Sequence, residues 1–399
     1  MLREDLTKNG IRPTPFHDRC VDHMETADWV QWAGYQTANV YASAEIEYFA
    51  ARNQCAVMDL TPMIKMNIKG PDAEIYLNRM VTRDVSRLKV GRVFYTVWCN
   101  DDGHVIDDGT VYHISDDEYM VCSQDRQYDW MQASAIGFDV TIEDVTDDIA
   151  ALALQGPTSC LALKNLGLKD IETMKPFDLR EFNFEGTNLL VSRTGFTGDL
   201  GYELWTANEA ALILWDRLFA AGKIQGVRPM GLAALDMTRI EAGFILPHAD
   251  FMPASHTLRN TRRRYPHEIG LDWVVHMDKG HFTGRRALID AKAKGKAKHI
   301  LVKIEIEFNK PADQAIIYHG KKSNVVGHVT SAHWSPTLKS NIALAELKLP
   351  YGDHIKNDLF VEVYTDKELK WEMTKAKIKI VDQPFFFPDR RRTTPPADF

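Results

Sequence analysis

The stretch "WCNDDGHVIDDGTVYHI", Trp98 to Ile114, sets the first constraint on the fold, because it reads as two strand segments around a turn. Side chains of an extended strand point alternately to its two faces. One face then carries Ile106, Asp108, Thr110, Tyr112 and Ile114, and the other carries Val105, Asp107 and Val111. One of the two adjacent carboxylates is therefore expected to point inward, where it needs a partner and becomes a site candidate. The alternative is an ordinary hairpin followed by strand-end acids.

Length and composition predict a soluble protein of two or three domains. The chain has 399 residues, of which 45% are hydrophobic and 26% charged. It has no run of about 18 apolar residues, and its N-terminus lacks the apolar core of a signal peptide, so we expect a cytoplasmic protein without membrane helices. The net charge of −7 argues against nucleic acid as the main partner.

No sequence motif predicts a metal or a nucleophilic catalytic centre. The five cysteines are scattered without a C-x-x-C pair, and the 14 histidines include no H-E-x-x-H. No G-x-S-x-G elbow is present, which argues against the commonest hydrolase type. We therefore expect reduced thiols and no metal.

Hydrophobic patterning predicts an α+β fold followed by an all-β module. Strand–strand–helix rounds recur up to about residue 290, and Ile46, Phe49 and Ala50 fall at helical spacing in one of the helices. From about residue 300, short strands follow one another without helices, which is typical of a barrel. The predicted domains are 1–290, with α+β lobes at roughly 55–145 and 1–54 plus 146–290, then a linker and a barrel at 300–388. The Pro-rich, charged tail 389–399 is expected to be poorly ordered.

The glycine-rich stretch "SRTGFTGDLGYELW" lacks the dinucleotide-binding fingerprint but places a carboxylate directly after three glycines. Glu203 follows them on a predicted strand. It can accept two parallel hydrogen bonds from a planar heterocycle edge, or it can be an exposed residue of a hairpin. In the helix "AALDMTRIEAG", Arg239 can bind a ligand or pair with Asp236 three residues earlier.

Together the motifs resemble the aminomethyltransferase family. This family contains the glycine cleavage T-protein and related tetrahydrofolate-dependent demethylases such as dimethylsulfoniopropionate demethylase. The markers run in order along nearly the whole chain: "TPFHDR", "NDDGHVIDD", "ALQGP", "TGFTGDLGYEL", "GLAALDMTRIEAG", "FTGRRAL" and "TSAHWSPTLKSNIALAEL". The resemblance implies a three-domain cloverleaf around a central folate channel, with the C-terminal β-barrel as one leaf.

The resemblance also implies roles for individual residues. Asp108 corresponds to the catalytic aspartate, with Asp107 supporting the turn, and tetrahydrofolate is the implied cofactor. The implied cofactor-binding residues are Tyr95, Glu203, Arg239, Phe196 and Cys122.

Four polar positions of the family pattern are altered in this chain. The family's "DVSHM" reads "DLTPM" with Pro62, and Cys122, Leu235 and Phe196 replace asparagine, arginine and tyrosine. A pocket with fewer hydrogen-bonding groups favours a small methylated N- or S-onium donor, which an aromatic face can hold. Trp98, Tyr202 and Trp334 are the candidate substrate residues, with Trp32 and Trp273 as further aromatic faces; the alternative for each is core packing.

The preferred prediction is therefore methyl transfer from such a donor to N5 of tetrahydrofolate. The alternative is the aminomethyltransferase of glycine cleavage, which requires a lipoyl carrier protein as partner. A third hypothesis is a non-catalytic folate-binding protein. It is weakened because "TGFTGDLGYE" lacks the cysteine that marks those relatives. The basic stretch Arg259–Arg264 is either a solvated loop or an anion-binding rim.

Overall fold

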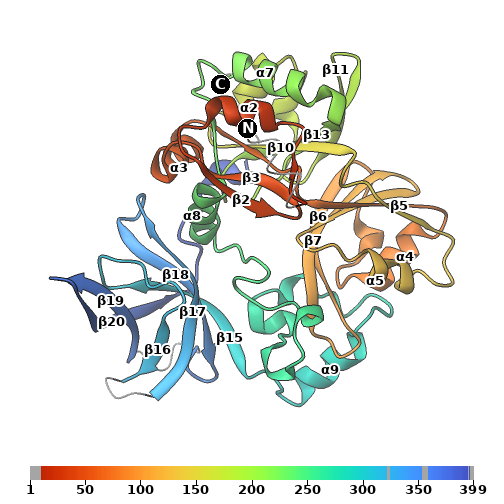
Figure 1. The fold of residues 1–399 in the computed structure, drawn as a ribbon. Coiled ribbons are helices and arrows are strands. Elements are labelled where there is room, and N and C mark those ends of the chain that lie inside the picture. Colours follow the sequence, from red (N-terminus) through yellow and green to blue (C-terminus); the bar gives the residue numbers. More distant parts are fainter. Residues whose placement is uncertain (1–9, 321–323, 353–357, 394, 396–399) are drawn as a thin grey trace.

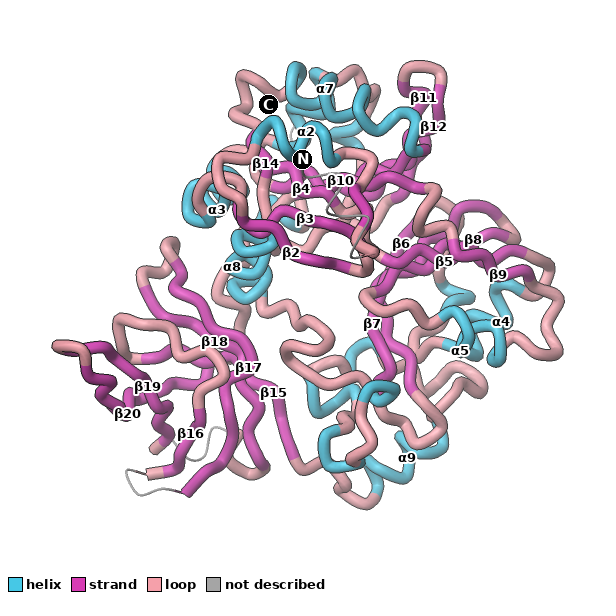
Figure 2. The backbone as a smooth tube through the Cα atoms, in the orientation of Figure 1, coloured by secondary structure: helices cyan, strands magenta, loops and turns pink. Residues whose placement is uncertain are grey.

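Three lobes and a connecting segment form the molecule, as the computed structural model of the chain shows (Figure 1). The structure describes residues 10–320, 324–352, 358–393 and 395. Helices and strands are mixed in the first two lobes, and the third is a barrel of strands (Figure 2). The predicted α+β fold with a C-terminal barrel is confirmed.

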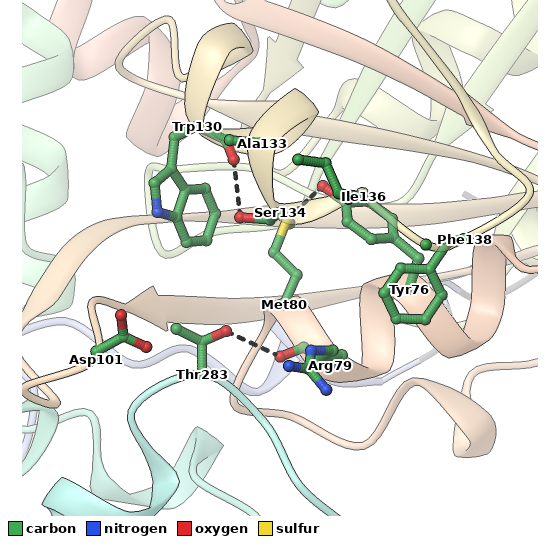
Figure 3. Close-up of a pocket in the computed structure, with 11 residues that line it drawn as sticks. Tyr76, Arg79, Met80, Asp101, Trp130, Ala133, Ser134, Ile136, Phe138 and Thr283 are labelled. Carbon is green, nitrogen blue, oxygen red and sulfur yellow. Dashed lines mark hydrogen bonds between the residues drawn. The ribbon is translucent and has the colours of Figure 1, made fainter.

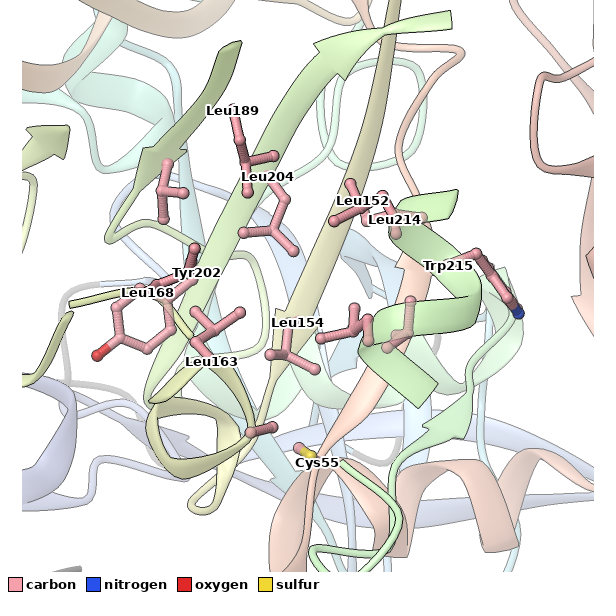
Figure 4. Packing of buried hydrophobic residues seen from close by; sticks show 14 of the residues in the cluster. Cys55, Leu152, Leu154, Leu163, Leu168, Leu189, Tyr202, Leu204, Leu214 and Trp215 are labelled. Atoms are coloured by element: carbon pink, nitrogen blue, oxygen red, sulfur yellow. The ribbon is translucent and has the colours of Figure 1, made fainter. Parts of the chain in front are cut away.

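The first lobe is built on a six-stranded sheet with strand order β11-β12-β13-β10-β4-β14. These strands are Leu179–Phe184, Thr187–Ser192, Gly201–Ala207, Ile149–Gln155, Ala56–Asp59 and Arg228–Pro229. A three-stranded sheet of order β1-β3-β2 adds Arg12–Pro13, Tyr35–Val40 and Asp28–Trp32. Helices α2, α6 and α7 span His17–His23, Ser159–Asn165 and Ala211–Ala221 and contribute Cys20, Leu163 and Trp215 to its main core. Figure 4 shows Leu163 and Trp215 in this core.

The second lobe is a five-stranded sheet of order β6-β7-β8-β5-β9. Its strands are Arg92–Cys99, Val105–Ser115, Glu118–Ser123, Ile64–Lys69 and Thr141–Asp144. Helices α4 (Ala73–Met80) and α5 (Tyr128–Ser134) pack on one face. On the other face Tyr112, Met120 and Cys122 share a core with Met58 and Trp205 of the first lobe. The two sheets therefore meet across the face that carries the candidate site.

The strand pairing places the start of the second lobe later in the chain than the predicted residue 55. Strand β4 pairs with β10 and β14 of the first lobe, so the second lobe begins at β5 rather than at residue 55. The cause is a crossing of the chain between the sheets in the short turn that contains Pro62.

A segment of short turns connects the first lobe to the barrel. It contains η4 to η7 and α9, which span Ala254–His256, Asn260–Arg262, Pro266–Ile269, Asp272–Val274 and Arg285–Ala293. Phe251, Val274 and Phe282 pack against Val97 and Val105 of the second lobe. The sequence pattern groups this segment with the first lobe, whereas in the structure its apolar side chains are buried against the ends of β6 and β7 of the second lobe.

The C-terminal module is a closed six-stranded barrel in the order β15-β18-β17-β16-β19-β20. Its strands are His299–Ile306, Ser340–Lys348, Asn324–Ser335, Ile316–His319, Leu359–Lys367 and Lys370–Val381. Alternate residues fill the interior, as Val302, Ile304 and Ile306 do from β15. Closure gives every strand a neighbour on both sides over at least part of its length, which limits the exposed strand edges.

Helices α3 (Ala44–Asn53) and α8 (Leu232–Ala242) pack against each other, and their buried residues are a shared apolar cluster and a buried ion pair. Of the three residues at helical spacing, Ala50 is buried, but Ile46 and Phe49 are 49% and 45% exposed. Instead Arg52 is buried and its guanidinium contacts the Glu241 carboxylate at 2.7 Å. Paired charges replace apolar side chains here because each satisfies the other's hydrogen bonds.

The beginning of the tail is ordered, contrary to the prediction. Residues Asp389–Arg391 form a 3-10 turn, and the Arg390 guanidinium donates to both oxygens of Asp199 at 2.6 and 2.7 Å. The Asp199 side chain is fully buried, so the tail neutralises a charge of the first lobe.

Replacing Arg390 by alanine should lower the free energy of unfolding by about 2 kcal/mol or more, because it leaves the buried Asp199 carboxylate without its cation. Urea unfolding monitored by circular dichroism measures the change. Arg392→Ala is the matched control in the same turn and should have little effect; equal midpoints for R390A and the wild type would contradict this account.

Within the described residues, no helix is long and apolar enough to cross a bilayer. All five cysteines are buried as free thiols, as their scattered positions predict. The remaining short helices are η1, η2, η3 and η8, at Val85–Arg87, Ile171–Thr173, Asn208–Ala210 and Asp389–Arg391.

Candidate functional site

A β-bulge in the opening hairpin orients the two aspartates. Trp98 pairs with Asp107, but Cys99 pairs with Val105, so Ile106 is an extra residue in β7. The predicted alternation therefore fails at this point: Ile106 joins the core of the second lobe, and Val105 changes to the face of Asp108. Such bulges re-aim side chains locally.

Asp107 is the inward-pointing carboxylate. It is fully buried and accepts backbone hydrogen bonds from Asp108 at 2.9 Å and from Asp125 at 3.1 Å. Burial and the neighbouring Asp108 charge raise the pKa of Asp107 well above its ordinary value. Asp107 thus fixes the turn after β8.

Asp108 lies on the opposite face and is partly exposed. The Tyr95 hydroxyl, from the neighbouring strand β6, donates to its carboxylate at 2.5 Å. Burial raises the pKa of Asp108 to about 6, while the Tyr95 hydrogen bond lowers it and the Asp250 charge raises it. A carboxyl group with this pKa can exchange a proton near neutral pH. Gly109 allows the close strand approach, because a Cβ there would lie 2.2 Å from the Cys122 carbonyl oxygen.

The same face of β7 leads from Asp108 through Thr110 to Tyr112, whose hydroxyl donates to Glu203 at 2.9 Å. Glu203 is 8% exposed on β13. Its Oε2 also accepts from Thr194 at 2.5 Å and from Ser192 at 3.3 Å. Burial raises the pKa of Glu203 although the three hydroxyls lower it.

The oxygens of Glu203 are used unequally. Within the described part of the chain every hydrogen bond goes to Oε2, and Oε1 has none. One planar N–H donor can therefore bind Oε1 directly, whereas a two-point contact requires one hydroxyl to release Oε2. The orphaned oxygen fits the amide or amine edge of a pterin.

Arg239 is an internal connector. Its guanidinium donates to Asp236 at 2.7 Å, to Ser331 of the barrel at 2.7 Å and to the Asp250 carboxylate. Asp250 in turn accepts from Thr330 at 2.6 Å. The network holds Asp250 in place, and the Asp250 charge raises the pKa of Asp108. Arg239 therefore influences Asp108 indirectly, by positioning Asp250.

Two family models match the chain: GCVT N-terminal domain over residues 16–279, and Glycine cleavage T-protein C-terminal barrel domain over residues 300–386. An aminomethyltransferase of Caldanaerobacter subterraneus is 34% identical over 371 residues, covering 91% of this chain and 94% of the relative. One of Clostridium botulinum is 33% identical over 387 residues, covering 94% of this chain and 98% of the relative.

The chain belongs to the glycine cleavage T-protein family. The crystal structure of glycine cleavage system aminomethyltransferase T from Bartonella henselae has the same fold, with a TM-score of 0.81. The two chains are 22% identical, and the match covers 96% of this chain and 100% of that one. The resemblance predicted from sequence is thereby confirmed, and with it the enzyme class of one-carbon transferases.

Two of the positions at which the chain departs from the family pattern, Pro62 and Cys122, lie before and beside strand β5. Cys122 is fully buried opposite Thr110, and its other strand neighbour is Lys65. The Lys65 ammonium donates to the carbonyls of Thr61 and Met63, both at 2.8 Å, and so holds the turn at Pro62. Burial lowers the pKa of Lys65 to about 8. The chain therefore has a turn held by Lys65 where the family pattern has histidine.

Two of the three predicted donor-site residues lie in hydrophobic cores. Trp98 is fully buried in the core of the second lobe. Tyr202 is fully buried among leucines of the first lobe, as Figure 4 shows. Neither ring has a face free for a substrate, so core packing applies to both.

Two other aromatic residues remain accessible near the site or on the barrel. Trp273 is 59% exposed and stacks on Tyr95 at 6.0 Å between ring centroids. Trp334 is 38% exposed on β17. Phe196, a predicted cofactor contact, is half-buried and stacks on Phe244 at 5.4 Å.

Two cavities lie away from the Asp108 carboxylate. The larger, of about 450 Å³, is lined by Tyr76, Trp130 and Thr283 among others, and no predicted site residue lines it (Figure 3). The second, of about 330 Å³, lies beside Arg239 and is lined by Asp236, Asp313 and His333. Only the second is adjacent to the Arg239–Asp250 network.

Two of the four arginines in the basic stretch Arg259–Arg264 are bonded to other parts of the chain. The Arg264 guanidinium pairs with Glu346 of the barrel at 2.6 and 2.7 Å and is buried. Arg263 donates to the Thr257 carbonyl at 3.1 Å. Arg259 and Arg262 are exposed.

The structure also assembles a group that sequence motifs do not indicate. Asp125, His248 and His256 bring three potential ligand atoms within 4.8 Å of one another. The residues come from separate turns, so no local spacing signals them.

Proposed function

We propose that the chain transfers a one-carbon unit to tetrahydrofolate, with an aminomethyl group on a lipoyl carrier protein as the donor. The carbon forms bonds to N5 and N10 of tetrahydrofolate while its bonds to sulfur and to the amine break, so that the dihydrolipoyl thiol and ammonia are released. The full-length relatives named aminomethyltransferase favour this donor over the small onium compounds preferred from the sequence. The burial of Trp98 and Tyr202 also removes much of the support for an onium site.

The observation that carries the proposal is the pair of carboxylates joined by one strand face. Glu203 offers its Oε1 to the pterin edge and is hydrogen-bonded to Tyr112 through Oε2. Asp108 lies four residues before Tyr112 on β7, so the two backbone positions are about 13 Å apart along the strand. Tetrahydrofolate supplies nucleophilic ring nitrogens when bound. The Asp108 carboxylate then stabilises positive charge at nitrogen and exchanges a proton with it.

Positioning contributes much of the expected rate, because the protein holds donor and acceptor as one complex. Tyr95 orients Asp108, and the Arg239–Asp250 network keeps a second negative charge nearby. Tyr95 and Asp250 therefore set the orientation of the Asp108 carboxylate and its affinity for a proton.

A second candidate remains methyl transfer from a small onium donor. The cavity beside Arg239 favours it, since the Asp313 carboxylate lines that cavity in addition to the Arg239–Asp236 ion pair. The test is a transfer assay with tetrahydrofolate and either an aminomethylated lipoyl carrier or betaine- and sulfonium-type donors. The proposal predicts 5,10-methylenetetrahydrofolate with the carrier only; 5-methyltetrahydrofolate from an onium donor would overturn it.

The reaction should lose rate in acid. Because the Asp108 pKa is about 6 and the carboxylate is the active form, kcat/KM should fall tenfold per pH unit below about pH 6. A pH–rate profile from pH 5 to 8 measures this limb. A profile that is flat across this range would contradict the role of Asp108.

Tyr95→Phe should move that limb to higher pH. The Tyr95 hydroxyl stabilises the ionised Asp108, so its loss raises the pKa of the carboxyl group. Activity at pH 7 should fall about tenfold and recover in part at pH 8. Tyr128→Phe, at an exposed position, is the control; an unshifted limb in Y95F would refute the coupling.

A further inference from the structure

The three side chains Asp125, His248 and His256 converge outside the carboxylate site just described. The His248 Nε2 lies 2.8 Å from Asp125 Oδ2, and the His256 Nδ1 lies 3.5 Å from the same oxygen. The two imidazole rings are 4.9 Å apart and nearly perpendicular, at 72°. Both histidine side chains are accessible, at 39% and 49% exposure.

Each of the three residues is held by its backbone. The Asp125 N–H donates to Asp107 at 3.1 Å. His248 has a φ of +68° and donates its N–H to the Phe251 carbonyl at 2.8 Å. His256 ends η4, which packs against β7. The side chains therefore converge on rigid turns, which favours a built site.

The spacing fits first-row metal coordination. Ligands at about 2.05 Å from a tetrahedral ion lie about 3.3 Å from one another. The two separations from Asp125, 2.8 and 3.5 Å, lie on either side of that value, and all three ligand atoms lie within 4.8 Å of one another. Two imidazole nitrogens with one carboxylate suit zinc-like ions, whereas magnesium and calcium prefer oxygen ligands alone.

We propose that Asp125, His248 and His256 form a binding site for one divalent transition-metal ion of the zinc class. Three protein ligands leave at least one coordination position for water or for a heteroatom of a small ligand. The ion would tie the loop that carries Asp250 to the turn after β8. The proposed ion takes part in no step of the proposed transfer reaction.

The competing account is a hydrogen-bonded His248–Asp125 pair without a metal. The two accounts predict different spectra and stoichiometries. A tag-free, chelator-treated full-length protein should be titrated with Co²⁺ alone and, in a separate experiment, dialysed against Zn²⁺.

The expected result is one Zn²⁺ per chain by elemental analysis and visible ligand-field absorption for bound Co²⁺. His248→Ala and His256→Ala should each weaken Co²⁺ binding by at least ~10-fold. Asp125→Asn tests the carboxylate with little change in shape and should weaken binding similarly. His281→Ala, at an exposed histidine elsewhere, should bind like the wild type.

Sub-stoichiometric Zn²⁺, or Co²⁺ binding that all three variants retain, would overturn the proposal. Far-UV circular dichroism of each variant establishes that lost binding is not lost folding. Since the readouts are stoichiometry and spectrum, their outcome is separate from that of the transferase assay.

Discussion

Asp108→Asn is expected to lower kcat by at least ~100-fold, the range typical of positioned acid–base groups. Asparagine keeps the shape and can still accept from the Tyr95 hydroxyl, but it cannot carry the charge or exchange the proton. Tetrahydrofolate should still bind, because Glu203 is unchanged. Steady-state kinetics with a parallel folate-binding titration separates the two effects.

The same variant should not be less stable than the wild type. The Asp108 pKa is raised on folding, so protonation stabilises the fold below about pH 4, and this contribution is lost as pH rises through about 6. At pH 8 asparagine removes the cost of a buried charge, and the thermal midpoint should equal or exceed that of the wild type. Asp102→Asn, in the exposed turn of the same hairpin, is the control and should leave the thermal midpoint unchanged.

For the kinetic prediction, near-normal turnover in D108N would exclude Asp108 from the chemistry.

Glu203→Ala is expected to weaken tetrahydrofolate binding by about 10- to 100-fold, since a hydrogen bond to a charged group contributes about 1.5–3 kcal/mol. Removing the carboxylate also deprives Tyr112, Ser192 and Thr194 of their common acceptor. Isothermal titration with tetrahydrofolate measures the loss, and the effect on KM should exceed that on kcat.

Glu203→Gln provides the second variant, because it keeps the volume and one acceptor oxygen. It should bind more weakly than the wild type and more tightly than Glu203→Ala. Glu181→Ala, at an exposed position on β11 of the same sheet, should leave binding unchanged. Unchanged affinity in E203A would remove Glu203 from the cofactor contact.

The sequence predicted the architecture and family because these follow from long-range order of motifs and from strand and helix periods. The barrel and the helix at 232–242 were predicted in this way. The bulge at Ile106 was not predicted, because it arises from the pairing of Cys99 with Val105 in the sheet. Strict alternation therefore misplaced the neighbours of the two aspartates.

Other details depended on tertiary partners that lie far away in sequence. Arg52 is buried on α3 because its guanidinium pairs with Glu241, 189 residues later. The ordering of Arg390 depends on Asp199, and the cluster of Asp125 with two histidines joins residues more than a hundred positions apart. Aromatic residues were placed in the donor site by composition alone, and core packing decided otherwise for Trp98 and Tyr202.

The most direct test of the site is a crystal structure of the protein with tetrahydrofolate bound. The account predicts the pterin edge within hydrogen-bonding distance of Glu203 Oε1, and N5 beside the Asp108 carboxylate. A reduced pterin bound elsewhere, with Asp108 directed to bulk water, would contradict it.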